Sequence, residues 1–373
     1  MDSAAFFKLM VDKGASDLFF SVGAPPNIKI QGITSPIEQA PIKSQQMIEL
    51  VYSLLNDKQQ KEFEANLELN MAISYPEIGR FRINVFKQRG EIAMVIRYIK
   101  ADIPSIEELS LPVILQSLVM EMRGLILVVG STGSGKSTTL AAMIDHRNQN
   151  YRGHILTIED PVEFLHSHKK SIIDQREVGI DTLSYDNALK NAMREAPDAI
   201  LIGEVRERST MKHALAYSET GHLCITTLHA NNANQTLERI VNFFPEEAKP
   251  QILSDLALNL RGIISLRLVP GIAHKRVPAV EILINTPYIS DLIEKGKVDE
   301  IKEVMARSTE QGMQTFDQAL LKLYRDGIIT KENAIKYADS KNNVSLEIRL
   351  NEEMGVDSAK DQLTIQADDV DKF

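Results

Sequence analysis

Cysteine is almost absent from this chain of 373 residues, which contains a single one, Cys224. One cysteine excludes a disulfide framework and a tetracysteine zinc module. Because Cys224 stands within the apolar run LCITTL, we expect it to be a small, buried core side chain.

The sequence also lacks a long apolar run. No window approaches the ~18 consecutive apolar residues of a membrane span. The start, MDSAAFFKLMVDKG, is interrupted by Asp2, Lys8 and Asp12, unlike a signal peptide. The composition, 43% hydrophobic and 25% charged, is typical of soluble domains. We therefore expect a cytoplasmic protein of two or three domains.

An excess of basic residues is missing as well. The net charge of -9 argues against a nucleic-acid partner, although it leaves a local basic channel possible. More than half of the negative excess lies in residues 351–373, which hold seven acids and two bases. This stretch has no apolar periodicity, so we expect a disordered acidic tail, with a docking role as the alternative to a solubilising one.

The apolar patterns divide the rest of the chain. Short strand patterns at 18–22 and 28–31 and a hairpin pattern at 81–86 and 93–99 indicate a small α+β domain. Helical periodicity dominates after about residue 285, where Thr315 with Gln318 three residues on predicts a capping box and Thr330 predicts an N-cap. We predict an N-terminal domain at 1–100, a linker at 101–122, a core domain at 123–285, a helical C-terminal region at 286–350 and the tail at 351–373.

Four apolar runs alternate with helix-like segments in the core. They lie at 125–129, 154–158, 199–202 and 223–228. Strands that alternate with helices at this interval predict a mainly parallel sheet covered on both faces, which makes the core an α/β fold.

A phosphate-binding loop follows the first of these runs. The stretch GSTGSGKS at 130–137 matches G-x-x-x-x-G-K-[ST], and it stands between a strand pattern and a helix pattern. Glycines let the backbone N–H groups face phosphates, Lys136 would reach the terminal phosphates, and Ser137 would bind Mg²⁺. The predicted nucleotide-binding residues are Gly130, Ser131, Thr132, Gly133, Ser134, Gly135, Lys136, Ser137 and Thr138.

Hydrolysis also needs carboxylates that orient water or hold Mg²⁺. In AILIGEVR an apolar strand leads to Glu204, at the edge of the sheet where ligands bind. In ILTIEDPVEF, Glu159, Asp160 and Glu163 follow another strand. Either set fits the role, and a solvated loop position is as good an interpretation of Glu159 or Asp160 taken alone.

Two histidines flank the run at 223–228. A strand there separates His222 and His229 by ~23 Å, so one small site cannot use both. The carboxyl end of a parallel strand favours His229, which would contact the γ-phosphate. His222 remains a candidate site residue with a structural role after Gly221 as an equal alternative.

The hairpin FRINVFKQRGEIAMVIRYI brings two arginines together. A turn centred between Arg89 and Gly90 places Arg82 directly opposite Arg97. Like charges in this position are destabilising, so an anion between them is expected, and the natural anion is a phosphate bound by another subunit. Two solvated arginines are the alternative.

These motifs together resemble the type IV pilus retraction ATPases, the PilT/PilU family of the secretion ATPase superfamily. The likeness runs from about residue 5 to about 350 and rests on GSTGSGKSTT, ILTIEDPVEF, AILIGEVR, ETGHLCITTLHA, RFRINVF and GMQTFDQAL. The resemblance implies a PAS-like α+β N-terminal domain followed by a RecA-like P-loop ATPase core with a helical C-terminal extension. It also implies that ATP and Mg²⁺ are the cofactors.

The resemblance assigns roles to several candidate residues. Glu163 is similar to the family's water activator, Glu204 to its Walker B acid and metal ligand, and His229 to its phosphate sensor. Arg82 and Arg97 match its arginine fingers. The implied assembly is a homo-hexamer in the cytoplasm, docked at the inner-membrane pilus machine. Its partners would be the pilus platform protein and a principal retraction ATPase.

Two positions separate branches within the family. The principal retraction motors usually have His where this chain has Phe19, and an AIRNLIRE-like helix where it has YISDLIEK. With the acidic tail, these differences resemble the accessory branch. The expected function is therefore a motor for pilus retraction that works with a principal ATPase. The alternatives are a mainly structural ring subunit, an extension or type II secretion ATPase, and a nucleic-acid translocase.

Overall fold

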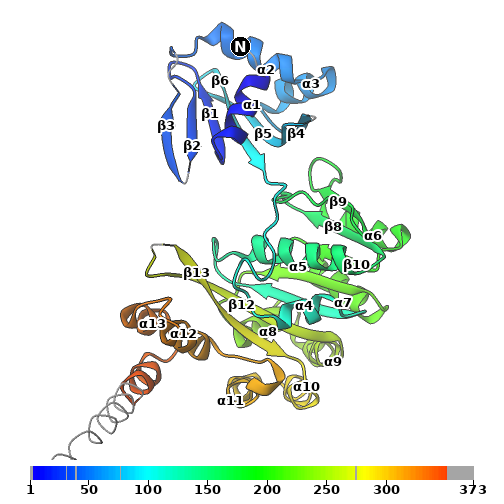
Figure 1. The fold of residues 1–373 in the computed structure, drawn as a ribbon. Helices are drawn as coiled ribbons and strands as arrows, with labels where there is room; N and C mark the ends of the chain where they lie inside the picture. Colours follow the sequence, from blue (N-terminus) through cyan, green and yellow to red (C-terminus); the bar gives the residue numbers. More distant parts are fainter. Residues whose placement is uncertain (1–2, 31, 38–39, 76, 274, 351–373) are drawn as a thin grey trace, which may run out of the picture. The chain divides into compact units, whose positions relative to one another are not determined.

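The computed structural model describes residues 3–350, except 31, 38–39, 76 and 274 (Figure 1). Two compact units are formed, one from residues 1–103 with 152–197 and the other from 104–151 with 198–373. The domain boundaries given above stay a prediction, and the acidic tail lies outside the described residues.

Unit 1 begins with a six-stranded antiparallel sheet in the order β3-β2-β1-β6-β5-β4. The remaining elements of this unit are three helices before β4, the parallel pair β8 and β9, one further helix and a 3-10 turn. The bounds are α1 Ser3–Asp12, β1 Asp17–Ser21, β2 Asn27–Ile30, β3 Ile33–Pro36, α2 Ser44–Leu54, α3 Asp57–Asn66, β4 Glu68–Tyr75, β5 Gly79–Gln88, β6 Glu91–Ile99, β8 His154–Glu159, β9 Ile172–Glu177, α6 Tyr185–Ala192 and η1 Met193–Glu195.

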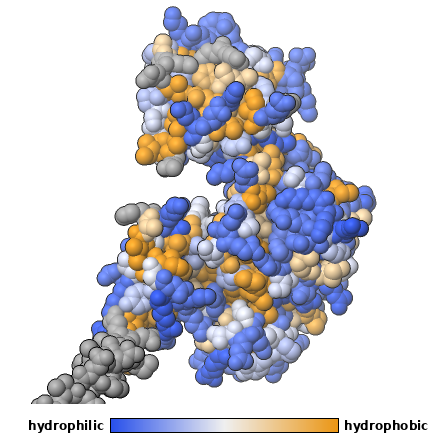
Figure 2. Space-filling model, viewed as in Figure 1, coloured by the Kyte–Doolittle hydropathy of each residue, from blue (hydrophilic) through white to orange (hydrophobic). Residues whose placement is uncertain are grey.

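Alternation of apolar and polar residues explains the antiparallel sheet. In β5 the side chains of Phe81, Ile83 and Val85 are buried and their neighbours face outward. Phe7 of α1 stacks on Phe81 with ring centroids 4.4 Å apart, which closes one side of this core. The faces of α2 and α3 that do not pack against this core carry mainly polar side chains. Figure 2 shows a mainly hydrophilic surface over these helices.

The β5–β6 hairpin turns where the sequence predicts. Arg89 and Gly90 both have positive φ, 53° and 81°, as a two-residue turn of this hand requires. Arg82 is therefore directly opposite Arg97, which confirms the predicted register.

Unit 2 contains the strands β13-β12-β7-β11-β10 in this spatial order. β10, β11, β7 and β12 run parallel, and β13 is antiparallel to β12. The bounds are α4 Ile114–Val119, β7 Gly124–Val129, α5 Lys136–Asn150, β10 Ala199–Ile202, α7 Arg208–Glu219, β11 Leu223–Leu228, α8 Ala233–Asn242, η2 Glu246–Ala248, α9 Lys249–Asn259, β12 Leu260–Pro270, β13 Arg276–Ile284, α10 Pro287–Glu294, η3 Val298–Glu300, α11 Ile301–Arg307, η4 Thr309–Gln311, α12 Phe316–Arg325 and α13 Lys331–Tyr337.

Every residue of β7, β10 and β11 is buried, as expected for central strands covered on both faces. Cys224 in β11 is fully buried, which confirms its expected place in the core, and burial raises the pKa of its thiol to about 12. In the C-terminal region, Thr315 forms the predicted capping box with Gln318, and Thr330 caps α13.

Candidate active site

The loop between β7 and α5 has a backbone that only glycine allows. Gly130 has φ 151°, and a Cβ there would lie 2.4 Å from Ser134 Oγ and 2.6 Å from the carbonyl oxygen of Leu266. Gly133 also has a positive φ, 76°. α5 begins at Lys136, so the free N–H groups and the positive dipole end of this helix lie at the loop.

The side chains of the loop fit a phosphate ligand. Lys136 Nζ donates to the carbonyl oxygens of Gly130 and Ser131, at 2.8 and 3.0 Å. Charged phosphate oxygens are stronger acceptors than these carbonyls, so the ammonium is held in place for a better partner. The buried Oγ of Ser134 has no hydrogen-bond partner within the described residues. The loop therefore presents donors and room where a phosphate would bind.

Two further candidate residues lie at the same edge of the sheet. Val129, the last residue of β7, pairs with Leu228, and His229 follows directly. Glu204 stands two residues after β10, the other neighbour of β11. His229 Nε2 is 3.1 Å from Glu204 Oε1, and Arg206 pairs with the second carboxylate oxygen at 2.8 Å. The structure thus brings His229 and Glu204 together beside the start of the phosphate loop.

His222 lies at the opposite edge of this sheet. Its carbonyl oxygen accepts a hydrogen bond from the N–H of Gly124 at 3.0 Å, at the beginning of β7. Its Nδ1 is 3.1 Å from Thr220 Oγ1, and its ring meets the ring of Tyr217 edge-on. These contacts join the end of α7 to two strands, and they do not bring His222 to the site of His229.

The carboxylates of the ILTIEDPVEF stretch belong to unit 1. Glu159 ends β8 and accepts hydrogen bonds from Thr157 Oγ1 at 2.7 Å and Gln175 Nε2 at 3.2 Å. Burial raises the pKa of Glu159 to about 7, and the charge of the nearby Glu163 adds to this shift. Glu159 is therefore a partly buried, hydrogen-bonded carboxyl at the end of a strand rather than a fully solvated loop acid. Glu163 is exposed in the segment after β8.

The paired arginines of the hairpin each have a carboxylate from their own chain. Arg97 Nε donates to Asp17 Oδ1 at 2.8 Å, and Asp17 faces Arg97 directly on β1. Arg82 Nε lies 3.8 Å from Glu177 Oε1, at the end of β9. These two carboxylates offset the repulsion between the arginines, so the register alone does not require a bound anion. Neither partner could be recognised from the sequence, because Asp17 and Glu177 both lie far from the hairpin along the chain.

Glu177 is the less satisfied of the two carboxylates. It is 1% exposed, and burial raises its pKa while the charge of Arg82 and the N–H of Val162 lower it. Its Oε1 makes no hydrogen bond among the described residues. A cavity of about 660 Å³ in unit 1 is lined by Arg82, Glu177, Asp160 and the backbone after β9. Arg82 is thus accessible from a polar hollow.

The sequence and the fold were compared with known proteins. The family model described as "Type II/IV secretion system protein" matches residues 10–364. The type IV pilus ATPase PilU of Pseudomonas aeruginosa is 52% identical over 96% of this chain and 94% of its own length. The chain belongs to this family. The type IV pilus retraction ATPase PilT of the same organism is 42% identical over 92% of this chain and 100% of its own length.

The crystal structure of the pilus retraction motor PilT with bound ADP is similar with a TM-score of 0.85. It is 42% identical, and the match covers 91% of this chain and 98% of that one. These comparisons confirm the predicted α/β fold class and place the chain among the PilT/PilU retraction ATPases. It is a nucleotide-binding P-loop ATPase.

Two structural features are absent from the part of the chain that the structure describes. No helix there is long and apolar enough to cross a membrane. No group of three or more His, Cys, Asp or Glu side chains there is arranged to hold a metal ion. The second finding is compatible with Mg²⁺, which takes one or two protein ligands when it also binds nucleotide phosphates.

Proposed function

We propose that this protein is a homo-hexameric ATP-driven motor for type IV pilus retraction that works together with a principal retraction ATPase. The pair formed by Glu204 and His229 beside the start of the phosphate loop carries the proposal. At this edge of the sheet a carboxylate can hold Mg²⁺ and an imidazole can contact the terminal phosphate, which are two functions that the loop alone does not supply.

The residues in and beside the phosphate loop have different proposed roles. Lys136 holds the terminal phosphates, while Ser137 and Glu204 hold Mg²⁺. When bound, Mg²⁺ neutralises the charge that develops on the phosphate oxygens. His229 has two possible partners, the Glu204 carboxylate at 3.1 Å and a phosphate, so its position reports which of them is present.

Unit 1 supplies the remaining proposed groups. Glu163 is proposed as the residue that activates water, on the family resemblance. Arg82 and Arg97 are proposed to act on the nucleotide of another subunit. Arg97 is 64% exposed at its side chain although its Nε pairs with the buried Asp17. A guanidinium has five N–H donors, so Arg97 can bind a phosphate while it keeps this pair. Fingers supplied in trans make the homo-hexamer a requirement for activity.

The proposed location is the cytoplasm, at the inner-membrane pilus machine, with the platform protein as the part that the motor turns. Phe19 and YISDLIEK depart from the principal branch, and they support an accessory role. A ring subunit that contributes little hydrolysis of its own is the second candidate function, and the same two departures favour it.

Steady-state ATP turnover by the size-fractionated oligomer tests the proposal, alone and mixed with the principal retraction ATPase. Glu204→Gln is expected to lower turnover by about 10²–10³-fold. Glu219→Gln is the matched control, because it makes the same change at an exposed position at the end of α7. Turnover that is equal in wild type and Glu204→Gln would contradict the proposed site. Activity that appears only on mixing would favour the accessory ring.

Retraction itself needs a separate assay. Twitching of a bacterium that lacks its accessory retraction ATPase should be restored by the wild-type chain and by Glu219→Gln, but not by Glu204→Gln. Restoration by all three would mean that the chain acts in retraction without hydrolysing ATP.

A further inference from the structure

A row of paired residues crosses the sheet of unit 2 at the edge where the phosphate loop begins. Leu228 of β11 pairs with Val129 of β7, Val129 with Ser265 of β12, and Ser265 with Glu281 of β13. The row therefore begins next to His229 and ends, two strands beyond the phosphate loop, at Glu281. An acidic residue is unexpected there, because Glu281 is only 2% exposed.

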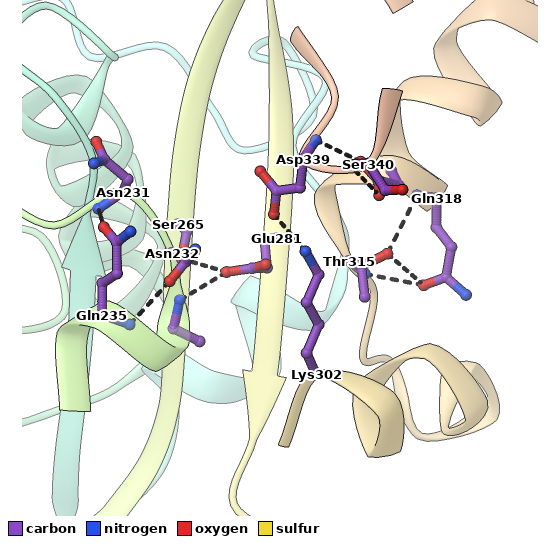
Figure 3. Close-up of polar contacts among 12 residues, drawn as sticks. Asn231, Asn232, Gln235, Ser265, Glu281, Lys302, Thr315, Gln318, Asp339 and Ser340 are labelled. Atoms are coloured by element: carbon purple, nitrogen blue, oxygen red, sulfur yellow. Dashed lines mark hydrogen bonds and ion pairs between the residues drawn. The ribbon is translucent and has the colours of Figure 1, made fainter. Parts of the chain in front are cut away.

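Glu281 anchors the chain four residues after His229, at the start of α8. The N–H of Ala233, the first residue of α8, donates to Glu281 Oε1 at 2.8 Å, and Ser265 Oγ donates to the same oxygen at 3.0 Å (Figure 3). Residues 229–232 thus bridge from β11 to a helix anchored on β13, across the end of β7. We call residues 229–232 the sensor segment. His229, the first residue of the sensor segment, contacts Glu204, and Ala233, the residue after the segment, is held by Glu281.

Arg267 of β12 holds the middle of the sensor segment. Its Nη2 donates to the carbonyl oxygen of Asn231 at 3.4 Å, and its Nη1 donates to that of Tyr337 at 2.9 Å. The guanidinium lies 3.7 Å from the ring centroid of Phe316 and pairs with Asp339 at 2.6 Å. Asn231 and Arg267 also line a cavity of about 200 Å³ that reaches the first two residues of the phosphate loop.

Asp339 continues the network into the C-terminal helices. It forms a second ion pair with Lys302 of α11 at 2.7 Å, and its own N–H donates to Asp317 of α12 at 2.8 Å (Figure 3). Burial opposes its ionisation, but the hydrogen bonds and charges of Lys302 and Arg267 outweigh this effect and lower the pKa of Asp339. Asp339 is therefore a charged junction between β12 and two helices.

We propose that Glu281 is a positioning residue for His229, and that Arg267 and Asp339 tie the sensor segment to the C-terminal helices. The inference rests on the proposed role of His229 in hydrolysis. A segment of four residues with both ends held cannot absorb a displacement of α8, so a shift at Ala233 reaches His229. Misplacement of a reacting group by about 1 Å lowers a rate by up to about 10²-fold.

A double-mutant cycle on kcat tests this positioning. Glu281→Ala should lower kcat by roughly 10-fold or more, with little change in KM for ATP. Burial raises the pKa of Glu281 to about 7, so the cycle is measured at about pH 8.5, where the carboxyl is ionised. Glu281→Gln then keeps an acceptor oxygen but loses the charge, and because a neutral acceptor is about half as strong, its kcat should fall about 3-fold. Each effect should vanish in the His229→Ala background, because Glu281 acts through that side chain. If Glu281→Ala does not assemble, Glu281→Gln carries the cycle.

Two further variants complete the experiment. Glu238→Gln makes the same change on the exposed face of α8 and should leave kcat unaltered. Asp339→Asn should lower kcat in wild type but not in His229→Ala, which would extend the positioning to the helices. The inference is overturned if Glu281→Gln turns over like wild type while His229→Ala is impaired, or if the two losses multiply. A His229→Ala protein with full activity would instead refute the proposed role of His229.

Discussion

Gly130 is the position where one added methyl group should do the most damage. A Cβ there would lie 2.4 Å from Ser134 Oγ and 2.6 Å from the carbonyl oxygen of Leu266. Ser134 can rotate away, but the Leu266 carbonyl belongs to β12, so the backbone must move by roughly 1 Å to restore an ordinary contact of about 3.5 Å. Overpacking costs about 1–3 kcal/mol, and a backbone conformation restricted to glycine costs about 1–3 kcal/mol. Gly130→Ala should therefore lower the free energy of unfolding by about 2–6 kcal/mol.

Thermal unfolding and the binding of a fluorescent ADP analogue measure this loss. At about 2–4 °C per kcal/mol, Tm should fall by at least about 4 °C, and nucleotide affinity should fall with it. Gly133→Ala is the matched control, because nothing lies within 4 Å of its Cβ and only the strain of φ 76° applies. That strain costs about 1–2 kcal/mol. Equal effects of the two variants, or a Gly130→Ala protein that melts and binds like wild type, would refute the steric argument.

Three further predictions concern other parts of the chain. Oligomers mixed from Arg97→Ala and Lys136→Ala subunits should regain part of the ATPase activity that each lacks alone, and no recovery would count against fingers in trans. Burial raises the pKa of Glu281 from 4.5 to about 7, so the protonated carboxyl favours the folded state. This contribution to the free energy of unfolding is fully present below pH 4.5 and is lost as the pH rises through 7. The Tm of Glu281→Gln relative to wild type should accordingly rise across this window, by the equivalent of up to roughly 3 kcal/mol; parallel Tm curves would contradict this. Cys224 should resist thiol reagents at pH 8 until the protein is unfolded, and rapid labelling of the native protein would show that β11 is not a closed core strand.

The sequence predicts those parts of the fold that depend on local pattern. The runs that became β7, β8, β10 and β11 consist mainly of apolar and β-branched residues, and such runs form central strands where helices cover both faces of a sheet. The hairpin register followed from a two-residue turn with Gly90. Capping at Thr315 followed from spacing. Each of these inferences needs only neighbours in sequence.

The sequence does not predict the role of a residue when that role depends on contacts with a strand that is distant along the chain. β12 and β13 were not among the predicted core strands, since Arg267 and Glu281 interrupt their apolar pattern. The arginine hairpin shows the same limit in another form. Its register is right, but the partner carboxylates, Asp17 and Glu177, come from strands on other parts of the chain. Repulsion between the two arginines therefore does not by itself require an external anion, and their role toward the nucleotide of another subunit stays a proposal.

Two polar residues that interrupt the apolar patterns of β12 and β13 have partners in or beside the sensor segment: Arg267 binds Asn231, and Glu281 binds Ala233. A buried carboxylate is expensive to desolvate, so an apolar residue at Glu281 would pack with less penalty. It would also leave the N–H of Ala233, and with it the start of α8, without an acceptor. The presence of an acidic residue at this buried position is thus best explained by the hydrogen bond that Glu281 accepts from Ala233. With His229 in its proposed role, β12 and β13 do more than complete the sheet, because Arg267 and Glu281 connect the segment that begins at His229 to the C-terminal helices and to α8.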